Sequence, residues 1–74
     1  MDNLEEVKAH LIATDETFRR LVDQHTDYDR RLEALEAKSA PTEEEQLEEV
    51  RLKKLKLNLK DQMAEYLQRA RAAV

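Results

Sequence analysis

One uninterrupted heptad spacing in the first half of the chain constrains its fold more than any other feature. Ten residues recur at alternating separations of three and four, as the a and d positions of a coiled-coil helix do. They are Leu4, Val7, Leu11, Thr14, Phe18, Leu21, His25, Tyr28, Leu32 and Leu35. The pattern predicts a long helix that packs lengthwise against another helix. It is weakest at Thr14, where the sequence TDET also resembles a helix start, so a kink or break there stays an open alternative.

The stretch KSAPTEEEQL marks the end of this helix and the start of a second one. Pro41 disfavours helical geometry at Ala40, and Thr42 followed by Glu45 is the signature of an N-terminal capping box. We therefore expect a helix over about residues 3–38, a turn over about 39–42 and a helix over about 43–71. A connection this short makes the two helices antiparallel neighbours.

The second helix contains LKKLKLNLKD, residues 52–61, whose alternating leucines also resemble a half-buried strand. A strand would account only for these leucines, and it would need turn residues that the flanking sequence lacks. A helix instead gathers apolar residues over about 20 positions onto one side, at 100° per residue. We therefore interpret the stretch as helix, with Leu57 and Val50 left on the opposite side.

Together the two patterns predict an all-α fold, an antiparallel two-helix hairpin that resembles a coiled coil. With the turn centred near residue 40, Phe18 should lie opposite about residue 62, and His25 should lie near Leu55. Phe18, Met63 and Tyr66 should then form a cluster. The predicted seam between the helices consists of Phe18, Leu21, His25, Tyr28, Leu32, Leu52, Leu55, Leu59, Met63 and Tyr66.

Three apolar residues of the second helix, Leu47, Val50 and Leu57, form a weaker ridge outside this seam. A lone hairpin would leave the ridge in water, whereas two hairpins packed together would cover it. We therefore expect a homo-oligomer, with a dimeric four-helix bundle favoured and a trimer as the alternative. A simpler interpretation is that Leu57 is exposed, as single leucines often are.

The composition agrees with a single helical domain over residues 1–74. Charged residues make up 41% of the chain, Gly and Cys are absent, and there is one Pro. Disulfides and Gly-rich phosphate loops therefore cannot form, and no apolar run approaches the length of a membrane span. Two thin helices offer no enclosed pocket in which carboxylates could become catalytic. We expect a cytoplasmic, non-enzymatic protein with no membrane association, no cofactor, and no catalytic or metal-binding residues.

A basic face on the second helix, formed by Lys53, Lys56 and Lys60, suggests a different function. Such a row could contact phosphates in a nucleic-acid-associated regulatory protein. Three features argue against nucleic acid as a partner: the net charge of −4, the lack of interleaved aromatic residues, and the acids expected nearby on the first helix.

His25 occupies an a position of the predicted seam, where a polar side chain often fixes the pairing of helices. It could also act as a pH-sensitive group or as a metal ligand. One histidine with a single carboxylate nearby, that of Asp29, is a poor metal site. We therefore favour a structural role.

Two stretches of the chain resemble the YdcH-like family of small bacterial proteins, which carry a domain of unknown function. The first runs from Phe18 to Asp29, FRRL followed by HTDYD, and the second runs from Val50 to Met63, VRLKKLKLNLKDQM. The resemblance covers roughly residues 14–67, although Tyr28 stands where the family is expected to have leucine. It implies a small helical, coiled-coil-forming protein and supplies no catalytic residues. We predict a module for self-assembly or for binding another protein.

Overall fold

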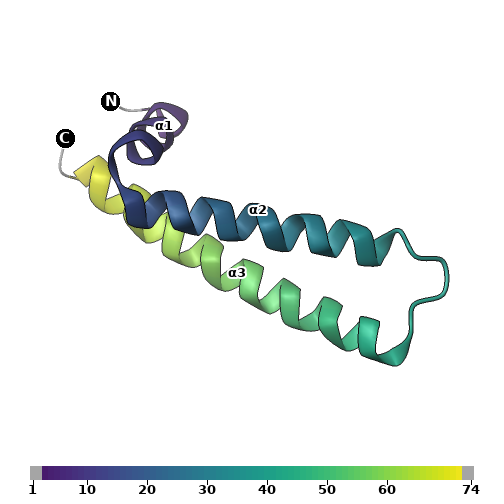
Figure 1. Cartoon of the computed structure of the whole chain (residues 1–74). Helices are drawn as coiled ribbons and strands as arrows, with labels where there is room; N and C mark the ends of the chain where they lie inside the picture. The colour runs from purple at the N-terminus through teal and green to yellow at the C-terminus, as the bar shows by residue number, and fades with distance from the viewer. Residues whose placement is uncertain (1–2, 73–74) are drawn as a thin grey trace.

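The computed structural model describes residues 3–72, which form three α-helices (Figure 1). α1 spans Leu4–Thr14, α2 spans Glu16–Glu36 and α3 spans Glu43–Ala72. These residues contain no strand, so the prediction of an all-α fold is confirmed. α2 and α3 run antiparallel, and the molecule is elongated, with extents of 49 × 20 × 16 Å. The two residues at each end of the predicted domain lie outside the described part of the chain.

The prediction of two helices is wrong in number, because the chain breaks at Asp15 and α1 turns away from the axis of α2 (Figure 1). Asp15 has extended backbone angles, φ −116° and ψ 109°, and its Oδ1 accepts a hydrogen bond from the Phe18 amide at 3.0 Å. Asp15 is thus the N-cap of α2. The break that the sequence left open at Thr14 lies one residue later.

α1 is held at both ends by side chains that contact its backbone. At its start, Asn3 Oδ1 accepts a hydrogen bond from the Glu5 amide at 2.8 Å. At its end, the Arg19 guanidinium donates to the carbonyls of Ile12 and Ala13, at 2.8 and 3.4 Å. These bonds satisfy backbone groups that a helix terminus leaves without partners. α1 is therefore a separate short helix rather than the first turns of a long one.

The loop between α2 and α3 reverses the chain without glycine. It covers residues 37–42 and is longer than the predicted 39–42, because α2 ends at Glu36. None of the described residues has a positive φ, so the reversal uses ordinary backbone geometry spread over several residues. The Thr42 amide donates to Glu45 Oε1 at 2.9 Å, and the Glu45 amide donates to Thr42 Oγ1 at 3.1 Å. The predicted capping box is therefore formed, and α3 begins at Glu43.

The core lies where α1 covers one end of the hairpin that α2 and α3 form. Phe18 is fully buried there, and its ring lies 6.0 Å from that of Tyr66, tilted by 48°. Val7 and Leu11 of α1 pack into the same cluster, with Met63 partly buried against it. The predicted cluster of Phe18, Met63 and Tyr66 is thus present. The buried apolar residues are Val7, Leu11, Phe18, Leu21, Leu32, Leu52 and Leu59.

The pairing of α2 with α3 is displaced by about one helical turn from the predicted pairing. Phe18 meets Tyr66 rather than residue 62, and Asp29 meets Lys56. Side chains lean toward the N-terminus of their own helix, so in an antiparallel pair both touching residues lie C-terminal to the contact. A register counted from the centre of the turn ignores this lean. Lys56, rather than Leu55, faces the opposite helix, because it continues the heptad series of Leu52 and Leu59.

One row of α3 residues at heptad spacing turns toward α1 and α2, and we call it the inner row. All its members are buried or half-buried: Glu45, Glu49, Leu52, Lys56, Leu59, Met63, Tyr66 and Ala70. The row is charged near the loop, and α2 and α3 separate in that direction (Figure 1). The apolar part of the helix contact therefore extends from Phe18 and Tyr66 to the buried Leu32 and Leu52, and the charged part lies beyond it, next to the loop.

Candidate interaction surface

A second row of residues at heptad spacing runs along the other side of α3, and we call it the outer row. At 100° per residue, the mean directions of the inner and outer rows differ by roughly 150°. The outer row therefore faces away from α2. Its members are all exposed: Glu43, Leu47, Val50, Lys54, Leu57, Asp61, Ala64, Gln68 and Arg71.

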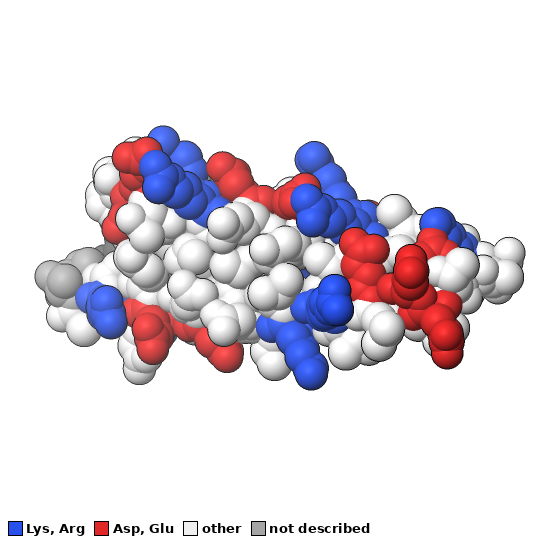
Figure 2. All heavy atoms as spheres, turned by 60° about the horizontal axis from the view of Figure 1, so that its bottom comes forward, with Lys and Arg blue, Asp and Glu red and all other residues white. Residues whose placement is uncertain are grey.

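Three large apolar side chains of the outer row form the ridge that the sequence predicted. Leu47 is 61% exposed, Val50 is 52% exposed and Leu57 is 59% exposed. α2 packs on the inner row and leaves all three more than half exposed. Figure 2 shows that on one long face of the molecule uncharged side chains form a band bordered by charged ones. Apolar side chains exposed in a row are more typical of a protein-binding face than of scattered surface leucines.

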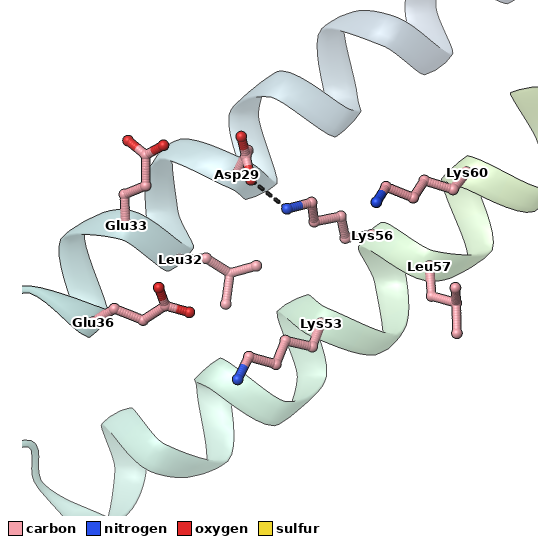
Figure 3. Close-up of a pocket in the computed structure, with 8 residues that line it drawn as sticks. All are labelled: Asp29, Leu32, Glu33, Glu36, Lys53, Lys56, Leu57 and Lys60. Atoms are coloured by element: carbon pink, nitrogen blue, oxygen red, sulfur yellow. Dashed lines mark hydrogen bonds and ion pairs between the residues drawn. The ribbon is translucent and has the colours of Figure 1, made fainter.

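A groove of about 370 Å³ lies on one side of the hairpin, between α2 and α3 (Figure 3). Its apolar lining consists of Leu32 and Leu57. Figure 3 shows the carboxylates on the wall from α2 and the ammonium groups on the wall from α3. Opposite charge on the two walls draws them together rather than leaving one sign of charge for a ligand. The charged lining residues are Asp29, Glu33, Glu36, Lys53, Lys56 and Lys60.

The predicted basic face of α3 is partly neutralised within the chain. Lys56 forms an ion pair and a hydrogen bond with Asp29 across the hairpin (Figure 3), and this bond lowers the pKa of the Asp29 carboxyl. Lys53 pairs with Glu49 on its own helix at 3.1 Å. Two of the three lysines of this face therefore already have acidic partners, and Lys60 lies on the same wall of the groove.

His25 lies half-buried between α2 and α3, and its Nε2 atom is buried without a hydrogen-bond partner among the described residues. Burial and the ammonium groups of Lys56 and Lys60 lower the pKa of its imidazole below the ordinary value of 6.5. The Asp29 carboxylate acts in the opposite direction, and Lys8 of α1 lowers the pKa further. The neutral imidazole is therefore the form that fits between the helices.

A second ion pair joins the loop to the first turn of α3. Lys38 pairs with Glu45, which is also part of the capping box with Thr42. The bonds from Lys38 and Thr42 lower the pKa of Glu45 from 4.5 to about 2. Figure 2 shows acidic side chains gathered toward this end of the molecule. Glu43, Glu44 and Glu45 make the first turn of α3 acidic, as the helix dipole favours.

The seam residues that the sequence predicted lie between the helices, with one exception. Leu55 is 47% exposed, although it was assigned to the seam. It lies at the edge of the apolar side of α3, because Lys56 occupies the inner-row position between Leu52 and Leu59. Tyr28, another predicted seam residue, has the Arg31 guanidinium above its ring, with the guanidinium carbon 6.0 Å from the ring centroid. Of the others, Phe18, Leu21, Leu32, Leu52 and Leu59 are buried, and His25, Tyr28, Met63 and Tyr66 are half-buried.

Two residues with structural roles were missed by the sequence prediction. Lys56 lies in the seam, and the signal for it was the heptad series through Leu52 and Leu59, in which Lys56 is the intervening member. Arg19 joins the end of α1 to the start of α2. No sequence pattern identifies Arg19, because its role depends on the direction that the chain takes after Asp15.

Metal-binding and membrane-spanning features are both absent from the described part of the chain. Residues 3–72 contain no group of three or more acidic, histidine or cysteine side chains placed to hold a metal ion. None of the three helices over these residues combines the length and the apolar character needed to cross a bilayer.

Comparison with known proteins identifies a family. A family model described as "Protein of unknown function (DUF465)" matches residues 18–67, more than half of the chain. The match covers nearly all of α2, the loop and most of α3, and it leaves α1 outside. No curated protein and no solved structure matches the chain significantly. The resemblance to the YdcH-like family agrees with the family model, and the chain therefore belongs to the DUF465 family of proteins of unknown function.

Proposed function

We propose that this protein is a small, non-enzymatic interaction module that assembles with a second copy of itself through α3. The observation that carries the proposal is the exposure of Leu47, Val50 and Leu57, each more than half in water, along one side of one helix. Residues 3–72 contain seven buried apolar residues, a small core for a domain. Domains this small often gain stability by oligomerisation. Burial of the three side chains between two copies would extend the apolar core.

Nucleic-acid association through Lys53, Lys56 and Lys60 is the alternative function, and the ion pairs of the hairpin weigh against it. A phosphate would have to compete with Asp29 for Lys56 and with Glu49 for Lys53. The exposed apolar ridge would also have no role in such a complex. Self-assembly through apolar contacts accounts for the ridge directly. The absence of cysteine suits the cytoplasmic location that we propose for this assembly.

Sedimentation equilibrium over a range from low to high micromolar protein tests self-assembly. The wild-type chain is expected to sediment as a dimer at the upper end of this range. The double variant Leu47→Ser/Leu57→Ser should shift the protein to monomer, because each substitution removes apolar area from the ridge. Leu55→Ser is the matched control, since it removes the same side chain from an exposed position of α3 outside the ridge. It should leave the dimer intact.

A monomer at several hundred micromolar protein would contradict the proposal. Salt separates the two functions, because apolar assembly changes little between low and moderate salt, whereas phosphate contacts weaken steeply. An electrophoretic mobility shift at low salt measures the alternative directly. Retardation of nucleic acid at micromolar protein, lost in a Lys53→Glu/Lys60→Glu variant, would favour nucleic-acid association instead.

A further inference from the structure

The charges of the outer row alternate in an order that identifies its partner. From the start of α3 to its end, the charged members are Glu43, Lys54, Asp61 and Arg71, and all four are exposed. A second copy laid alongside in the opposite direction brings Glu43 of one chain to Arg71 of the other. The same alignment brings Lys54 to Asp61. Leu57 is the central member of the outer row, between the two members of each pair, so it meets its own copy at the centre.

We propose that the outer row of α3 pairs with the outer row of a second copy, antiparallel, about a two-fold axis near Leu57. This inference rests on the proposed function and specifies its geometry. A two-fold interface uses the same surface of both chains, so every complementary charge contact occurs twice. Parallel alignment would instead place each charge beside its own copy, and charges within a helix seam commonly select orientation in this way.

A shallow groove beside the outer row provides independent support. It has a volume of about 280 Å³ and is lined by Leu4, Ala64, Leu67, Gln68 and Arg71, at the end of α3 that α1 covers. In the antiparallel alignment, Leu47 of the second copy lies opposite Gln68, at this groove. The exposed Leu4 of α1 and the half-buried Leu67 then give Leu47 an apolar surface. Helices commonly pair by inserting such a side chain into a hollow on the partner.

The alignment changes the arrangement expected for the assembled protein. Because the inner and outer rows lie roughly 150° apart around α3, α2 and the second copy occupy nearly opposite sides of this helix. The four long helices of a dimer then lie side by side in the order α2, α3, α3, α2. This arrangement differs from the four-helix bundle that the sequence analysis favoured.

A charge exchange within α3 tests the antiparallel alignment. Lys54→Asp and Asp61→Lys should each weaken the dimer by roughly tenfold or more, because each places like charges together twice. The double variant Lys54→Asp/Asp61→Lys should regain most of the wild-type affinity. Residues 54 and 61 lie about 10 Å apart along one helix, so recovery requires contact between two chains. Sedimentation equilibrium gives all four affinities, and a double variant weaker than both single variants would overturn the alignment.

Disulfide cross-linking locates the two-fold axis, because the chain has no cysteine of its own. Leu57→Cys should form a covalent dimer rapidly under mild oxidation, whereas the matched control Leu55→Cys should not. If the wild-type protein is a dimer but only Leu55→Cys cross-links, the self-assembly function stands and the α3 alignment is overturned. A wild-type protein that is monomeric at all concentrations would overturn both.

Discussion

At the scale of single residues, His25 links the fold to pH. Burial and the charges of Lys56 and Lys60 lower its pKa below 6.5, so the folded chain favours the neutral imidazole. The unfolded chain then binds a proton more readily than the folded chain as the pH falls below 6.5, and the fold loses stability. We expect the free energy of unfolding, measured by urea denaturation, to decrease from about pH 7 to about pH 5.

His25→Leu should remove this pH dependence. It should also raise the free energy of unfolding at neutral pH by about 1 kcal/mol, since it replaces a buried nitrogen that lacks a hydrogen-bond partner. His10→Gln, a change at an exposed histidine of α1, is the control and should retain the dependence. The carboxyls of Asp29 and Glu45 have pKa values lowered from 3.8 and 4.5. The fold therefore loses stability through their protonation only at more acidic pH than through the protonation of His25. An unchanged slope in His25→Leu would contradict the role assigned to this residue.

The residue of α3 that lies in the seam between Leu52 and Leu59 is Lys56, not the predicted Leu55. Leu55 and Lys56 are neighbours on the edge and centre of the same side of α3, and the preference for apolar side chains in a seam favoured Leu55. Strict heptad spacing favours Lys56, and its acidic partner Asp29 on the other helix is identified only by the fold. Lys56 then reaches Asp29, and Leu55 remains exposed.

At the scale of the helices, Asp15 separates α1 from α2. Asp15→Ala removes the carboxylate that accepts from the Phe18 amide, so we expect the free energy of unfolding to fall by about 1 kcal/mol. Because Ala also permits continuous helix, α1 should leave the cluster around Phe18 more often. Hydrogen exchange of the α1 amides should therefore become faster, whereas the amides in the middle of α3 change less.

Asp15→Asn and Asp23→Ala are the controls for this experiment. Asn keeps a side-chain oxygen at the cap and should preserve most of the stability. Asp23 is exposed in the interior of α2, and its change to Ala removes the same group without affecting a helix end. If Asp15→Ala and Asp23→Ala have equal effects, the break is not maintained by this cap.

Capping residues in the sequence predicted where α3 begins more accurately than periodicity predicted the change of direction between α1 and α2. Thr42 and Glu45 form their capping box because its bonds join residues three positions apart. The break near residue 15 was visible as an alternative, but the heptad series continued through it and favoured one long helix. The choice depends on the burial of Val7 and Leu11 against Phe18 and on the bonds from Arg19 to α1. Those contacts exist only after the chain has folded back.

At the scale of the whole molecule, the apolar cluster to which all three helices contribute lies at one end. α1 closes the end of the hairpin around Phe18, while α2 and α3 separate toward the loop (Figure 1). Periodicity predicted the antiparallel hairpin, because each long helix carries its own apolar row. It did not show that the contact would loosen toward the loop, where Glu45 and Glu49 occupy the inner row. The outer row of α3 therefore offers apolar surface that the folded chain itself leaves uncovered.

Association through that surface should make thermal stability depend on protein concentration. A dimer that dissociates as it unfolds melts at a higher temperature when the protein is more concentrated, by mass action. For a chain of this size we expect Tm, followed by circular dichroism, to rise by about 10 °C over a hundredfold increase in concentration. Leu47→Ser/Leu57→Ser should melt at a lower temperature that is independent of concentration, whereas Leu55→Ser should keep the dependence. A wild-type Tm that stays constant over the hundredfold range would show that the outer row contributes nothing to folding through a second copy.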